Sequence, residues 1–204
     1  MLDEERPLLP IQASDNNTYV LGRIGQHNIV MACLPEYGTI NAAVVATNLK
    51  RSFPEIRATL MVGIGGGPPS QADLYLGDVV VGTRVMQYDM GKVIVGGYFQ
   101  ETAVAKTPAP LLNSAVSTLR SRLDPSSPSR ITSLLRSRLP NLWNLWRLNH
   151  PDRLFQADYE HCLDAQTCDG CDPEKLQLRK ARFTDEPKIH YGVIASGNRV
   201  MKNG

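Results

Sequence analysis

Residues 58–67 read ATLMVGIGGG, an apolar run that stops at a cluster of glycines followed by Pro68 and Pro69. A continuous apolar run bounded by turn residues is typical of a β-strand that is buried on both faces of a sheet. Glycines after such a strand let the backbone N–H groups approach a ligand closely. The stretch therefore predicts a buried strand over residues 58–64, followed by a loop that either turns the chain or contacts a ligand.

The segments on either side of this stretch alternate between strand and helix patterns. A hairpin is predicted where Gly25-Gln26 joins two β-rich runs, residues 18–24 and 27–34. The other predicted elements are a helix over residues 41–49, a strand over residues 76–83, a helix over residues 107–123 and a strand over residues 189–196. Strands separated by helices predict an α/β fold, in which ligands bind at the carboxyl ends of the strands.

The composition is that of an ordinary globular chain, with 204 residues, 42% hydrophobic residues and a net charge of +2. This charge is too small for a general nucleic-acid binder, and no apolar run reaches the roughly 18 residues of a membrane-spanning helix. The opening MLDEERPLLP also lacks the features of a secretory signal. We therefore expect no DNA or RNA partner, no membrane partner and a cytoplasmic location. The Arg- and Trp-rich residues 130–153 predict an amphipathic helix with Leu and Trp in the core and Arg toward solvent. The alternatives are a basic helix on an anionic membrane or nucleic-acid surface, and contact of Arg136 and Arg138 with a nucleotide phosphate.

The four cysteines, Cys33, Cys162, Cys168 and Cys171, are too unevenly spaced for a disulfide framework. Cys168 and Cys171 have the C-x-x-C spacing of a zinc clip, and the candidates for further ligands are His161, Cys162 and His190. No second C-x-x-C pair follows. We therefore predict loop thiols, no metal and no cofactor, and keep the zinc clip as the alternative.

Four motifs follow one another along the chain: GIGGG at 63–67, GDVVV at 77–81, QYD at 87–89 and IASGN at 194–198. This order resembles the nucleoside phosphorylase and nucleosidase superfamily, which includes the purine and uridine phosphorylases. More narrowly, the chain resembles the amino-terminal phosphorylase-like domains of fungal NLR-like receptors. The resemblance implies a three-layer α/β fold around a central twisted mixed β-sheet. It also implies one domain over residues 1–204, truncated at both ends, with a variable insertion at about residues 124–186.

The activity that the resemblance implies is cleavage of the N-glycosidic bond of a nucleoside or nucleotide, with a purine as the expected base. The site residues that it implies are Gly63, Ile64, Gly65 and Gly66 beside base, ribose and nucleophile, Val200 and Met201 against the base, and Asp89, Ser196 and Asn198 from the later motifs. A turn role for Asp89 is the alternative, and Asn198 stands where nucleosidases carry an aspartate. Asp78, in the turn before the GDVVV strand, is predicted to cap backbone N–H groups.

Phosphate is a doubtful nucleophile, because Met61 and Ile64 stand where uridine phosphorylases carry an arginine and a threonine. Arg57 and Arg84 are weak candidates for a phosphate site, so hydrolysis is favoured and phosphate is kept as a candidate co-substrate. The acidic catalytic residues expected from the family lie outside the 204 residues, which predicts a weak or inactive chain. We expect a nucleoside or nucleotide ligand, a homo-oligomer and an effector role in a larger fungal receptor. The alternative is an inactive nucleoside-binding or regulatory module.

Overall fold

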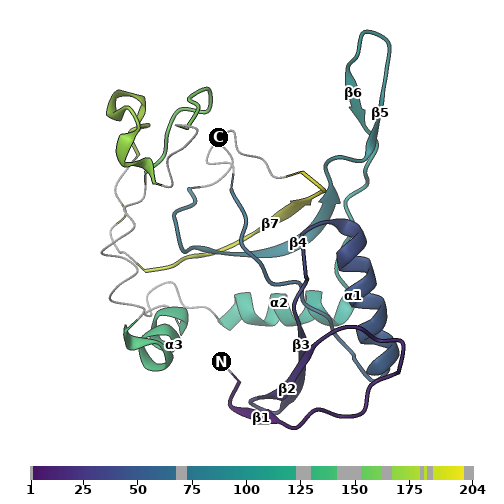
Figure 1. Ribbon diagram of the computed structural model, residues 1–204. Helices are drawn as coiled ribbons and strands as arrows, with labels where there is room; N and C mark the ends of the chain where they lie inside the picture. Colours follow the sequence, from purple (N-terminus) through teal and green to yellow (C-terminus); the bar gives the residue numbers. More distant parts are fainter. Residues whose placement is uncertain are drawn as a thin grey trace. The chain divides into compact units, whose positions relative to one another are not determined.

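The computed structural model describes residues 2–67, 73–122, 130–141, 153–161, 167–179, 182 and 186–199. The elements along the chain are β1 (Glu4–Arg6), β2 (Tyr19–Ile24), β3 (His27–Ala32), α1 (Thr39–Ser52), β4 (Val79–Gln87), β5 (Gly91–Val93), β6 (Phe99–Glu101), α2 (Pro110–Arg122), α3 (Arg130–Arg138) and β7 (Ile189–Ser196) (Figure 1). The chain divides into a first unit of Met1–Val62, Arg84–Ala115 and Ile194–Arg199, and a second unit of Gly63–Thr83, Val116–Val193 and Val200–Gly204.

The first unit contains an antiparallel sheet of β1, β2 and β3 in that order. Ile24 pairs with His27 across a two-residue turn, in which Gly25 has a φ of 58°. Glycine adopts this left-handed conformation without the steric cost that a side chain brings. The predicted hairpin is therefore confirmed, with Gly25 as the residue that allows it.

The core of the first unit lies between this sheet and α1. Tyr19 and Leu21 of β2 and Leu49 of α1 are buried together. The ring of Phe53, which follows α1, meets the Tyr19 ring edge-on at 5.0 Å between centroids. The Tyr19 hydroxyl donates to the Asp15 carboxylate at 2.7 Å, so its polar end is satisfied. The helix predicted over residues 41–49 is confirmed as α1, which is longer than the pattern of small residues indicated.

Strands β4 and β7 form a parallel pair. The N–H of Val79 donates to the Lys188 carbonyl at 2.9 Å, and the N–H of Tyr88 donates to the Ser196 carbonyl at 3.0 Å, so both strands advance in the same direction. The strand predicted over residues 189–196 is confirmed. The one predicted over residues 76–83 begins later, because Gly77 turns with a φ of 84°, and it continues to Gln87.

The buried strand predicted over residues 58–64 is wrong for this structure. The run has no regular secondary structure, and Leu60, Val62 and Ile64 are 71%, 87% and 107% exposed. A strand of this kind needs a hydrogen-bonded neighbour and a covering layer. Among the residues that the structure describes, no strand pairs with it. An apolar pattern predicts what a strand can bury, and only its neighbours decide whether it does.

The remaining elements complete the α/β class. Strands β5 and β6 form a small antiparallel hairpin that the sequence reasoning missed, as it missed β1. Helix α2 confirms the helix predicted after Thr107, and α3 covers the first part of the Arg-rich stretch, while Trp143 and Trp146 lie outside the described residues. Parallel and antiparallel pairing occur together with three helices in the described chain, which confirms the predicted mixed α/β class.

None of the described helices combines the length and the apolar character that crossing a membrane requires.

Candidate functional site at the carboxyl ends of β4 and β7

The carboxyl ends of β4 and β7 bring Asp89 and Asn198 together, although 109 residues separate them. The backbone N–H of Asn198 donates to Oδ2 of Asp89 at 2.8 Å, and its side-chain Nδ2 lies 3.4 Å from the same oxygen. The carbonyl of Ser196 accepts the Tyr88 N–H beside them. Three residues predicted for ligand binding or for the turn, Asp89, Ser196 and Asn198, thus meet at the strand ends. The parallel pairing of the two strands is the cause, since it places both carboxyl ends at one edge.

Helix α1 begins at this same junction. The side-chain Oδ1 of Asn198 accepts hydrogen bonds from the Thr39 backbone N–H at 2.8 Å and from the Thr39 hydroxyl at 3.0 Å. The residue before the helix, Gly38, has a φ of 119° and no side chain with which to cap it. Asn198 therefore supplies the cap from the other end of the chain. Sequence reasoning missed Thr39 as a site residue, although a Gly-Thr pair before a helical pattern was a usable signal.

The Asp89 carboxyl group is ionised at neutral pH. The hydrogen bond from the Asn198 backbone, followed by one from the Gln87 side chain at 2.9 Å, lowers the pKa of Asp89 below its ordinary value. Both bonds stabilise the charged form. Asp89 can therefore accept hydrogen bonds from hydroxyl or N–H groups of a ligand, and it does not donate a proton near neutral pH.

The turn after β7 requires glycine at position 197. A Cβ atom there would lie 2.5 Å from Cε1 of Tyr88 and 3.1 Å from Cγ of Asp89. The Tyr88 hydroxyl donates to the Arg199 carbonyl, which holds the ring against this turn. Gly197 thus shapes the turn, because a larger residue would collide with the Tyr88 ring.

The glycine loop belongs to the second unit. Gly63, Gly65 and Gly66 have open space where a Cβ atom would be, and none of them has a positive φ. Ile64 between them is fully exposed. Nothing in the described fold therefore demands glycine at these three positions.

For four further predicted site residues, the proposed contacts stay predictions. Arg57 and Arg84 are exposed residues of the first unit, and their phosphate role stays a prediction. Val200 and Met201 lie outside the described residues, so their predicted contacts with the base stay predictions as well.

Asp78 of the second unit has the capping role predicted for it. Its carboxylate accepts the backbone N–H groups of Tyr75 at 3.0 Å and Lys188 at 2.9 Å. Arg182 binds it at 2.8 Å, and Nε2 of His190 lies 2.9 Å away. Burial by itself would raise the pKa of Asp78, but these bonds outweigh it and hold the pKa well below the ordinary value. Asp78 is therefore a structural carboxylate.

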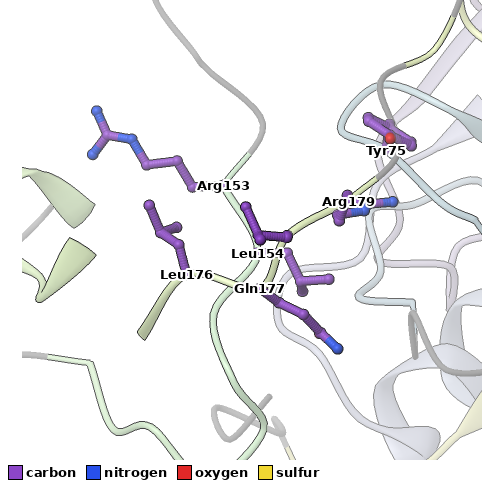
Figure 2. Close-up of a pocket in the computed structure, with 7 residues that line it drawn as sticks. Tyr75, Arg153, Leu154, Leu176, Gln177 and Arg179 are labelled. Atoms are coloured by element: carbon purple, nitrogen blue, oxygen red, sulfur yellow. The ribbon is translucent and has the colours of Figure 1, made fainter. Parts of the chain in front are cut away.

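A hollow of about 300 Å³ in the second unit contains none of the predicted site residues. Figure 2 shows Arg153 and Arg179 with Leu154 and Leu176 at this pocket. Arg153 pairs with Asp169 at 2.9 Å. Arg179 pairs with Asp73, and its Cζ atom lies 3.7 Å from the centroid of the Tyr75 ring. Because both cations already have partners, the pocket offers no ready phosphate site.

Comparison with known proteins defines the class of the chain. The model of the phosphorylase superfamily matches residues 3–202, so the chain belongs to the phosphorylase superfamily. The resemblance noted in the sequence is thereby confirmed. The chain is also 38% identical over 215 residues to a "Nucleotide-binding leucine-rich repeat (NLR)-like protein" of Hyaloscypha variabilis (strain UAMH 11265 / GT02V1 / F). That alignment covers 97% of this chain and 20% of the relative, so the chain spans about a fifth of the relative's length. No solved structure is significantly similar to the chain.

Proposed function

We propose that this phosphorylase-superfamily chain binds a nucleoside or nucleotide at the junction of Asp89, Asn198 and Thr39. The chain then cleaves the N-glycosidic bond of that ligand. In the full-length protein it would be the effector domain of an NLR-like receptor. The observation that carries the proposal is the ionised Asp89 carboxylate at the carboxyl ends of two parallel strands. In open α/β folds this is where ligands bind.

The chemistry of the junction suits a ribosyl group. Ribose hydroxyls are hydrogen-bond donors, and Asp89 offers a negatively charged acceptor. Breaking an N-glycosidic bond develops positive charge on the sugar, and a fixed carboxylate stabilises that charge. The Thr39 hydroxyl adds a further polar group, since it can accept a hydrogen bond from the ligand while it donates to Asn198. These groups support ligand binding and charge stabilisation.

The glycine loop of the second unit is a separate indication that this chain binds a ligand. Gly63, Gly65 and Gly66 are neither crowded nor in the left-handed conformation. Glycine at such positions is explained when another molecule approaches the backbone closely. The backbone N–H groups of the loop can then donate to polar atoms of that molecule.

A non-catalytic nucleoside-binding module is the second candidate, and one observation favours it. Release of a purine base is helped by an acid that protonates the leaving nitrogen. The lowered pKa of Asp89 leaves it without a proton near neutral pH, and Asn198 is an amide. The junction itself therefore supplies binding groups and no general acid. Under this second proposal, the chain would regulate an attached domain through ligand binding.

The test measures base release and ligand binding on the same protein. The chain is incubated with ATP, adenosine, inosine and uridine, with and without phosphate, and free base is measured by chromatography, while calorimetry measures binding. Base release that Asp89→Asn reduces and Asp158→Asn does not would support the enzyme. Asp158 is a suitable control because it is an exposed aspartate outside the junction. Saturable binding without release would support the module, and absence of both would contradict the two proposals.

Phosphate dependence decides the nucleophile. Release without phosphate would show hydrolysis, as the sequence favours. Release only with phosphate would show phosphorolysis, and Arg57→Gln and Arg84→Gln would then test which arginine holds the anion. A homo-oligomer and a cytoplasmic location remain part of the proposal, and sedimentation and fluorescence microscopy of the tagged full-length protein test them.

A further inference from the structure

Three side chains with metal-binding atoms lie together in the second unit: His161, Cys168 and Cys171. A ring nitrogen and the two sulfur atoms all lie within 4.8 Å of one another. Cys171 is buried, Cys168 is half-buried, and both are free thiols. The proposed nucleoside function uses none of these groups.

Backbone contacts hold the histidine segment against the cysteine segment. Phe155 and Leu176 form an antiparallel bridge between the two segments. The backbone N–H of Asp172, directly after the second cysteine, donates to the Tyr159 hydroxyl at 2.8 Å. The Tyr159 ring also stacks on Phe155, with 5.3 Å between the centroids. These three contacts, none of which uses a ring nitrogen or a thiol, bring the histidine segment and the cysteine segment together.

The two cysteines lie at either end of a tight turn. A 3-10 turn covers Cys168–Gly170, and the N–H of Cys171 donates to the Cys168 carbonyl at 3.3 Å. In tetrahedral zinc sites, bonds of about 2.3 Å to sulfur and 2.0 Å to nitrogen place neighbouring ligand atoms about 3.5–3.8 Å apart. The observed separations of at most 4.8 Å exceed this by about 1 Å at most, a difference that small side-chain rotations remove.

The donor set selects the class of metal. Two thiolates and an imidazole suit Zn²⁺, whereas Mg²⁺ and Ca²⁺ prefer oxygen ligands. The competing chemistry is a disulfide between Cys168 and Cys171, in which neither sulfur would be available as a thiolate ligand. The closeness of His161 to both thiols favours the metal.

We infer that His161, Cys168 and Cys171 bind a zinc ion that fastens residues 153–161 to residues 167–179. The three side chains leave the fourth tetrahedral position to water or a further donor. This zinc site shares no residue with the proposed nucleoside site, and its role is structural: metal binding stabilises a stretch that has few buried side chains among its described residues.

The first experiment measures metal directly in the intact chain. Zinc is quantified in protein purified without added metal or chelator, and we expect about one zinc ion per chain. After removal of the zinc, titration with Co²⁺ should produce the near-ultraviolet charge-transfer absorption of thiolate ligands. Zinc should also protect Cys168 and Cys171 from alkylation, with the exposed thiol of Cys33 modified in both states.

Matched variants locate the ligands. Cys168→Ser, Cys171→Ser and His161→Gln should each weaken Co²⁺ binding more than about tenfold, since even outer-shell partners contribute that much to metal affinity. Cys33→Ser and His27→Gln change exposed residues of the first unit and should leave it unchanged. Cys162, which lies outside the described residues, stays unsubstituted throughout.

Three results would overturn the site. They are a wild-type chain that gives no thiolate absorption with Co²⁺, a Cys168–Cys171 disulfide in the freshly purified protein, and control variants that lose the metal as fully as the ligand variants. The measurements on the wild-type chain keep the test decisive if a ligand variant fails to fold.

Discussion

Asp78 is the centre of a buried charge cluster at the start of β4. Its side chain is 2% exposed, that of Arg182 is 8% exposed, and the two are hydrogen bonded. Removing one partner of a buried pair leaves the other charge without compensation. We expect Asp78→Asn to lower the free energy of unfolding by roughly 3–5 kcal/mol. Urea denaturation measures this. Asp73→Asn is the control, because Asp73 is 61% exposed and exposed pairs contribute only about 0–1 kcal/mol.

The same carboxylate predicts how stability depends on pH. The folded-state pKa of Asp78 lies below its ordinary value. The ionised carboxylate therefore makes its full contribution to the free energy of unfolding at pH values above the ordinary aspartate pKa of about 3.9. The contribution is lost as the pH falls below that value, because the unfolded chain then binds the proton more readily. Stability measured from pH 6 to pH 3 should fall more steeply in the wild type than in Asp78→Asn. Parallel curves for the two proteins would show that Asp78 is not the group concerned.

A substitution at Gly65 tests whether the glycine loop is a structural turn or contacts a ligand. Since a Cβ atom there meets nothing within 4 Å, Gly65→Ala should leave stability unchanged or raise it by up to about 1 kcal/mol. If the loop contacts the ligand, calorimetry should show nucleoside binding weakened by roughly tenfold. Gly192→Ala, at an equally open glycine in β7, should change neither quantity strongly. A large loss of stability in Gly65→Ala would point to a structural turn.

At the scale of elements, α1 depends on a cap from the opposite end of the chain. Asn198 accepts both the backbone N–H and the hydroxyl of Thr39, while Gly38 offers no side chain. Loss of a helix cap costs about 0.5–2 kcal/mol, so we expect Asn198→Ala to destabilise the chain by that amount. Thermal unfolding measures it. Thr47→Ala, at an exposed position within α1, is the control and should stay within about 0.5 kcal/mol of the wild type.

Local patterns predicted the hairpin and β7 correctly, but they did not predict whether the run over residues 58–64 finds a partner strand. The hairpin follows from Gly25 and two adjacent β-rich runs, and β7 follows from one continuous run closed by a glycine turn. The run over residues 58–64 has an equally strong apolar pattern, yet it is exposed. Pairing of a strand is decided by segments that approach from elsewhere, and periodicity carries no information about them.

At the scale of the whole molecule, the exposed apolar run predicts association between chains. Leu60 and Val62 are 71% and 87% exposed and belong to one continuous apolar segment. Contiguous apolar surface of this kind favours contact with another protein surface, and a second copy is the partner present in a pure sample. Sedimentation should show self-association that the double variant Leu60→Ser, Val62→Ser reduces. The control is Val95→Ser, Val104→Ser, since these valines are also highly exposed, at 97% and 81%, but lie outside the run. Monomeric wild-type protein at all concentrations would contradict this prediction.

The sequence by itself determined the family, the α/β class and the identity of Asp89 and Asn198 as site candidates, because ordered motifs and local periodicity lie within short stretches of chain. The tertiary structure alone decided that Asn198 caps α1 through Thr39, that Asp78 is paired with Arg182, and that His161 lies beside two thiols. Each of these contacts joins residues that local patterns treat independently. Their closeness arises from strand direction, burial of charge and backbone pairing, which exist only once the chain has folded.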